Sequence, residues 1–125
     1  MPRRPAIEDR QSFTFELGHL VRTVTTRDGG TYTHRCALDA YQAVAWFIVE
    51  HAGQGVTTNM LWEAAPEIPC TQASVAVAFM KERGCLAVRM RRMFPAAEFF
   101  YEDALIEWHA LAHHAANSES GGDRP

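Results

Sequence analysis

The chain has 125 residues, of which 47% are hydrophobic, and a formal net charge of −3. This length allows one domain with a buried core and is too short for two ordinary domains. The acidic balance is atypical of a nucleic-acid-binding protein, whose surface is usually basic, and no stretch approaches the roughly 18 apolar residues that a membrane-spanning helix needs.

The cysteines Cys36, Cys70 and Cys85 form no CxxC pair. Because an odd number of thiols cannot be fully paired within one chain, neither a disulfide framework nor a structural zinc site is predicted. Free thiols suit a reducing compartment, and the two arginines near the start are followed by no apolar run. The sequence therefore predicts a cytoplasmic protein that crosses no membrane.

The first part of the chain predicts an arm followed by strands. Residues 1–11 are polar and contain proline, which is typical of a flexible arm, and the folded domain is expected over residues 12–115. Apolar residues then alternate with polar ones, and β-branched residues flank a turn signal at Asp28-Gly29-Gly30. The predicted strands cover residues 12–17, 20–27 and 31–36.

Three helices are predicted next. The apolar spacing changes to the helical period over residues 38–52, which we expect to form a central buried helix. A second helix is expected to begin at a Thr57 or Thr58 cap and to stop before Pro66. The third helix is predicted to begin at a Thr71 cap and to end at Gly84.

The spacing after Gly84 indicates a hairpin and a last helix. Alternating residues predict a strand, and a turn around residues 94–97 is expected to return the chain as EFFYED, which gives a hairpin of about 18 residues. A terminal helix is expected from its cap at Asp103. Residues 116–125 are polar and glycine-rich, which predicts a disordered tail.

This order of strands, three helices and a hairpin is that of a winged helix. The stretch LDAYQAVAWFIVEHAGQGVTTNMLWEAAP, preceded by strands, resembles OmpR/PhoB-type effector domains, and MKERGCL resembles the end of the third helix in winged-helix regulators. The resemblance covers about residues 12–102. It implies an α+β winged helix-turn-helix with a small N-terminal sheet, a three-helix core and a hairpin wing, to which this chain adds a terminal helix.

The chain departs from that family at two points. Such domains usually carry a glycine-tyrosine pair at the end of the wing, where this sequence has Phe99-Phe100-Tyr101, and no receiver domain precedes it. The departures leave the predicted fold unchanged, but two-component signalling is not implied.

A helical wheel divides the third helix into two faces. Ala73, Ala76, Val77 and Met80 are assigned to the core. The opposite face has small and polar side chains that permit close approach to base edges, and the amide of Gln72 can pair with adenine. A plain solvated surface explains this face equally well. The residues of this helix predicted to contact DNA are Thr71, Gln72, Ser74, Val75, Ala78 and Lys81.

The hairpin carries the stronger signal. Arg89, Arg91 and Arg92 stand within four residues of one another. They can contact phosphates or enter the minor groove. Charges on a hairpin edge can also serve only to prevent strand addition.

The sequence thus predicts a small bacterial or phage transcription regulator that binds double-stranded DNA, has no enzymatic activity and needs no cofactor. The alternative is a winged-helix module that docks on a protein or nucleoprotein partner. Trp108 and Leu111 on the terminal helix predict a homodimer. His109 and His113 lie one helical turn apart, a spacing that can hold a metal, but a partly exposed helix end explains them better and no metal site is predicted.

Overall fold

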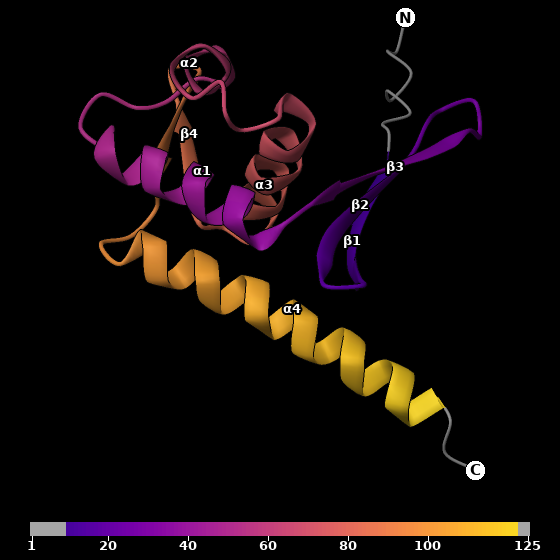
Figure 1. Cartoon of the computed structure of the whole chain (residues 1–125). Coiled ribbons are helices and arrows are strands. Elements are labelled where there is room, and N and C mark those ends of the chain that lie inside the picture. The colour runs from indigo at the N-terminus through magenta and orange to yellow at the C-terminus, as the bar shows by residue number, and fades with distance from the viewer. Residues whose placement is uncertain (1–9, 123–125) are drawn as a thin grey trace, which may run out of the picture.

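The computed structural model describes residues 10–122 and contains a three-stranded sheet, a two-stranded hairpin and four helices. Figure 1 shows the sheet beside the first three helices, with the long last helix running beneath both. Within the described residues, no helix is long and apolar enough to cross a membrane. The predicted mixed α+β class is confirmed.

The sheet consists of β1 (Arg10–Glu16), β2 (His19–Thr25) and β3 (Thr31–Cys36), antiparallel and in that order. Strands lie where the alternation predicts them. The turn between β2 and β3 is closed by the N–H of Thr26, which donates to the carbonyl of Gly30 at 2.8 Å. The Asp28 carboxylate accepts hydrogen bonds from the Thr26 hydroxyl and the Gly30 N–H. The aspartate side chain thus stabilises the turn together with the glycines.

One face of the sheet packs against the helices. Phe15, Leu20 and Cys36 are successive cross-strand partners on that face, and all three are buried. The rings of Phe13 and Phe79 meet edge to face with centroids 5.2 Å apart. On the opposite face, Arg35 of β3 forms an ion pair with Glu16 of β1 at 3.0 Å.

The first three helices are α1 (Leu38–Glu50), α2 (Thr58–Ala64) and α3 (Cys70–Glu82). Thr57 caps α2, because its Oγ1 accepts a hydrogen bond from the N–H of Met60 at 3.1 Å. The predicted cap at Thr71 is wrong. Pro69 is the N-cap of α3, and its carbonyl accepts the first helical bond from Ala73 at 2.9 Å, which places Thr71 inside the first turn.

Gly84 ends α3 as predicted. Gly84 has φ 77. Its N–H donates to the carbonyl of Lys81 at 3.1 Å, and the N–H of Cys85 donates to the carbonyl of Met80 at 2.9 Å. This pair of bonds is the Schellman motif, whose left-handed residue favours glycine. The motif reverses the chain and directs it into the hairpin.

The hairpin is shorter than predicted. It consists of β4 (Leu86–Arg89) and β5 (Arg92–Pro95), so the turn lies at Met90 and Arg91 and not at residues 94–97. These two residues have φ 54 and 66, the left-handed conformation of a two-residue hairpin turn. The sequence does not predict this turn, because neither residue is the glycine, asparagine or aspartate that such turns favour.

The EFFYED segment enters the last helix and forms no strand. Helix α4 (Phe100–Gly122) begins before the predicted cap at Asp103. The Asp103 N–H donates to the carbonyl of Phe99 at 2.8 Å, so Asp103 lies in the first turn, where a negative charge suits the helix dipole. The helix continues to Gly122, beyond the start of the predicted tail. Of the predicted arm, Arg10 and Gln11 belong to β1; residues 1–9 and 123–125 lie outside the described residues.

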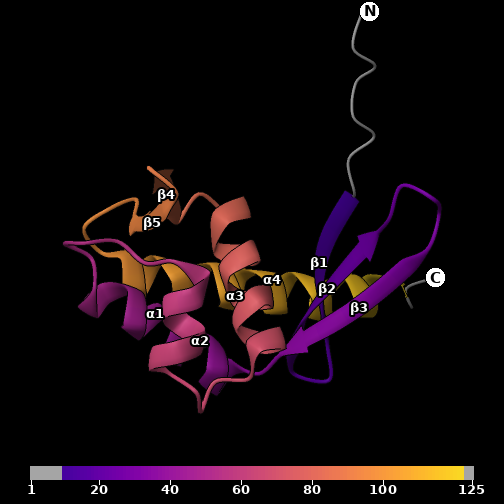
Figure 2. The ribbon, with the colours of Figure 1, turned by 90° about the horizontal axis from the view of Figure 1, so that it is seen from above.

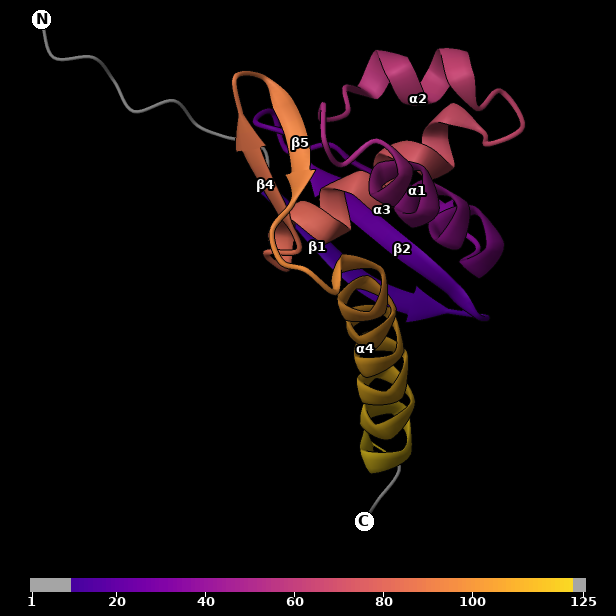
Figure 3. The ribbon, with the colours of Figure 1, turned by 90° about the vertical axis from the view of Figure 1, so that its left-hand side faces the viewer.

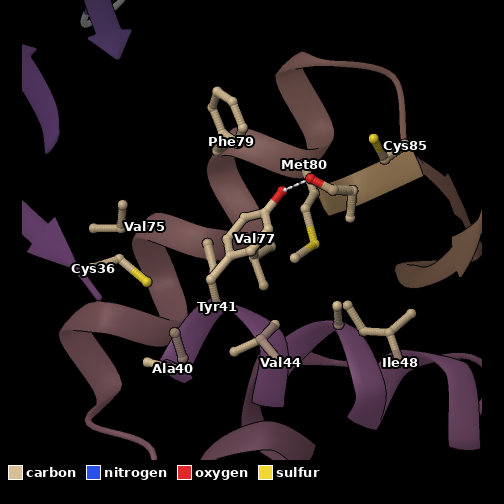
Figure 4. Close-up of a cluster of buried hydrophobic side chains, with 14 of the residues drawn as sticks. Cys36, Ala40, Tyr41, Val44, Ile48, Val75, Val77, Phe79, Met80 and Cys85 are labelled. Atoms are coloured by element: carbon tan, nitrogen blue, oxygen red, sulfur yellow. Dashed lines mark hydrogen bonds between the residues drawn. The ribbon is translucent and has the colours of Figure 1, made fainter. Parts of the chain in front are cut away.

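The core joins α1, α3, α4 and the sheet. Figure 4 shows the part of it where α1 faces α3, with Cys36 of β3 beside them. Tyr41 of α1 is fully buried, and its hydroxyl donates to the carbonyl of Ala104 in α4 at 2.6 Å. The Trp108 ring lies 4.7 Å from that of Tyr41. Trp108 and Leu111 are only 3% and 9% exposed. They belong to the core of their own chain and cannot form the predicted dimer contact.

Candidate nucleic-acid interface

The β4–β5 hairpin is joined to the helices through Val56, which lies two residues before α2. The N–H of Val56 donates to the carbonyl of Met93 at 2.9 Å, and the N–H of Met93 donates back at 2.8 Å. Val56 is completely buried and Met93 nearly so. The hairpin contacts α1 through β5 and α3 through β4, and Figure 3 shows it on the other side of the domain from the end of α4. The hairpin is therefore held against the segment that leads into α2.

The three arginines of the hairpin have different surroundings. The Arg89 guanidinium lies 4.2 Å from the centre of the Phe94 ring. Arg92 reaches the carbonyls of Gln54 and Gly55, with Nη1–O distances of 3.4 and 3.5 Å. Arg91 occupies the exposed turn. Arg89 and Arg92, two of the three arginines predicted to contact DNA, thus also make contacts within the protein. Arg91 is the arginine that lies in the exposed turn.

The outer face of α3 is narrower than the helical wheel predicts. Val75 is wrongly assigned to that face, since it is completely buried and lies near Cys36 (Figure 4). Gln72 is half-buried, and its Oε1 accepts a hydrogen bond from the N–H of Ala37 at 2.9 Å, so the amide oxygen is engaged inside the molecule and cannot pair with adenine at the same time. Val75 and Phe79 are buried because α3 packs against the sheet as well as against α1.

Four predicted residues remain on the surface of α3. Figure 2 shows the helix lying between α2 and the sheet. Thr71 and Lys81 are exposed, and Ser74 and Ala78 are half-buried. We call these four residues the outer stripe. Its members are Thr71, Ser74, Ala78 and Lys81.

A depression of about 340 Å³ borders the outer stripe. It lies between α3, the β1–β2 pair and the start of α2, and we call it the β2–α3 groove. Sequence reasoning missed the contribution of the sheet, although Arg22 interrupts an apolar alternation and so must share the helix-facing side with Leu20 and Val24. Polar or small side chains line the groove: Gln11, Arg22, Thr58, Ser74, Ala78 and Lys81.

The ionisable groups elsewhere do not assemble into a reactive site in the described residues. Burial raises the pKa of Cys36 to about 12 and that of Cys85 to about 11, so both thiols are protonated at neutral pH. His113 lies 3.1 Å from the side-chain nitrogen of Asn117. Within residues 10–122, no three His, Cys, Asp or Glu side chains are grouped closely enough to hold a metal ion.

No protein-family model, curated protein or solved structure matches the chain.

Proposed function

We propose that the protein is a winged-helix DNA-binding protein, a small bacterial or phage transcription regulator without enzymatic activity or a cofactor. The observation that carries the proposal is the reciprocal pairing of Val56 with Met93. It attaches the β4–β5 hairpin to the segment that leads into α2, so that two short-linked helices and a hairpin form one unit. This is the arrangement in which a helix-turn-helix is accompanied by a wing.

The outer stripe would face the major groove. Ser74 and Ala78 are short enough for the helix backbone to come close to base edges, and Lys81 supplies a positive charge at the end of the stripe. Gln72 and Val75 take no part in this contact. Base recognition through α3 would therefore be modest, and phosphate contacts would supply most of the affinity.

The test is binding of the full chain to a generic DNA duplex over a range of salt concentrations. We expect micromolar binding at about 50 mM salt. The binding should weaken as the salt concentration rises, because each phosphate contact contributes about 0.9 to the slope of log affinity against log salt. Arg91→Ala should reduce that slope by about one contact for every sequence. Arg83→Ala is the matched control, since Arg83 is paired with Glu107 at 3.8 Å. A chain that does not bind DNA at 50 mM salt contradicts the proposal.

The alternative function is a module that binds a protein. It is favoured by large apolar side chains on the surface away from the outer stripe: Trp46 is 53% exposed and Phe99 63% exposed. Aromatic residues are enriched at protein interfaces. On this alternative, DNA would fail to bind, and Trp46→Ala would weaken binding of the partner while leaving the unfolding free energy nearly unchanged.

A further inference from the structure

The β2–α3 groove combines residues from three elements that are distant in sequence. Arg22 comes from the central strand, Lys81 from the last turn of α3 and Thr58 from the start of α2. Buried Val77 closes the floor of the groove. Figure 2 shows why these elements meet: α3 lies beside the sheet on one flank and beside α2 on the other.

The register of the sheet holds the arginine in a defined position. Phe13 is the cross-strand partner of Arg22, and Gln11 is two residues before Phe13, so all three side chains are on the helix-facing side. The Arg22 Nε donates to the Gln11 Oε1 at 2.8 Å. Among the described residues this is the one hydrogen bond of the guanidinium, and the two Nη groups keep their donors for another molecule.

The groove is positively charged in a chain that is acidic as a whole. Its lining contains Arg22 and Lys81 and no carboxylate, whereas the net charge of the protein is −3. The ion pairs found in the part of the chain that the structure describes involve Arg35 and Arg83 instead. Two cations are therefore left with neutral donors, the hydroxyls of Ser74 and Thr58, beside them.

This set of donors matches a phosphate group. A guanidinium presents paired N–H donors that fit two phosphate oxygens, an ammonium adds a point charge, and hydroxyls add neutral hydrogen bonds. We propose that the β2–α3 groove binds a phosphate of the nucleic-acid backbone, with Arg22 and Lys81 as its charged donors. That this phosphate belongs to a nucleic acid rests on the proposed function. The sheet would then add a contact next to the outer stripe, and the DNA footprint would extend beyond the helix and hairpin.

The first experiment measures DNA binding of the full chain with single substitutions. Arg22→Gln and Lys81→Gln should each lower the salt slope by about 0.9 and weaken binding roughly three- to tenfold. Arg22→Lys should retain the slope, because it keeps the charge. The matched control is Arg35→Gln, which removes a charge from the opposite face of the same sheet. Thermal unfolding of each variant verifies that the fold is intact.

The second experiment uses inorganic pyrophosphate as the probe and follows the backbone amides by NMR. Shifts at Thr58, Ser74 and Ala78 that vanish in Arg22→Gln support the groove even for a chain that does not bind DNA, in which case only the proposed function is lost. Arg22 separates the two proposals, because Lys81 also belongs to the outer stripe. If DNA binds and Arg22→Gln behaves like Arg35→Gln, the groove proposal is overturned and the proposed function stands. Absence of both DNA binding and amide shifts overturns both.

Discussion

The three cysteines show how position in the fold determines the chemistry of identical side chains. Cys36 and Cys85 are buried, whereas Cys70 is exposed in the first turn of α3. Desolvation disfavours the charged thiolate and raises the pKa of both buried groups. Reactivity toward alkylating agents follows the thiolate population and access.

We therefore expect iodoacetamide at pH 8 to label Cys70 in the folded protein and all three cysteines in denaturant, as read by mass spectrometry. The stability should also depend on alkaline pH. Unfolded thiols ionise near pH 9.0 and the folded ones at about 11 and 12, so ionisation favours the unfolded chain as the pH rises through this interval. Equal labelling of the three cysteines in the folded protein would contradict this assignment.

Among the elements, the β4–β5 hairpin packs closely against one glycine, Gly55. Gly55 has φ 84, and a Cβ at this position would lie 2.6 Å from the Phe94 Cζ and 2.9 Å from the Arg92 Cβ. A side chain at position 55 would thus be strained by its backbone conformation and would also displace the hairpin.

Gly55→Ala should lower the free energy of unfolding by about 2 kcal/mol or more, as measured by urea denaturation. Gly53→Ala is the matched control in the same loop. An added Cβ at Gly53 meets no atom within 4 Å, so this variant should be neutral or more stable by up to about 1 kcal/mol. If the two variants have the same stability, the hairpin does not press on the loop.

The elements that the sequence predicts well are those with a local cause. The strands follow the alternation of side chains, Thr57 is a cap by its chemistry, and Gly84 adopts the conformation that glycine favours. The turn at Met90 and Arg91 was missed because it follows from the register of β4 on β5, in which Arg89 pairs with Arg92, and not from the preferences of its own two residues.

The candidate site was predictable only in part for a related reason. A helical wheel assumes one buried face, but α3 packs on two neighbours, and this second contact buries Val75. Arg89, Arg91 and Arg92 do lie on a hairpin, as predicted. Arg22 could be linked to Lys81 only once the position of the sheet relative to α3 was known.

For the molecule as a whole, α4 is an integral part of the core. Phe15 of the sheet and Tyr41 of α1 both contact the Trp108 ring, with centroid distances of 4.8 and 4.7 Å. A helix that was predicted to lie outside the minimal fold, with a role in dimer formation, thus connects the sheet to the helices.

Trp108→Ala should lower the free energy of unfolding by about 3–5 kcal/mol, because it leaves a cavity between three elements. It should leave the molar mass from light scattering unchanged wherever the variant is folded. Ile106→Ala is the control on the same helix, as Ile106 is 61% exposed, and it should change the stability by less than about 0.5 kcal/mol. A variant at Trp108 that halves the molar mass would restore the dimer hypothesis.

The bond from Tyr41 to Ala104 also bears on how the chain folds during its synthesis. The two residues are 63 positions apart, and the ribosome adds about 5–20 residues per second. For several seconds α1 is therefore outside the ribosome without the helix that covers its buried tyrosine. The β2–β3 hairpin can form early from local contacts, whereas the side of α1 that carries Tyr41 stays uncovered by α4 until that helix has been made.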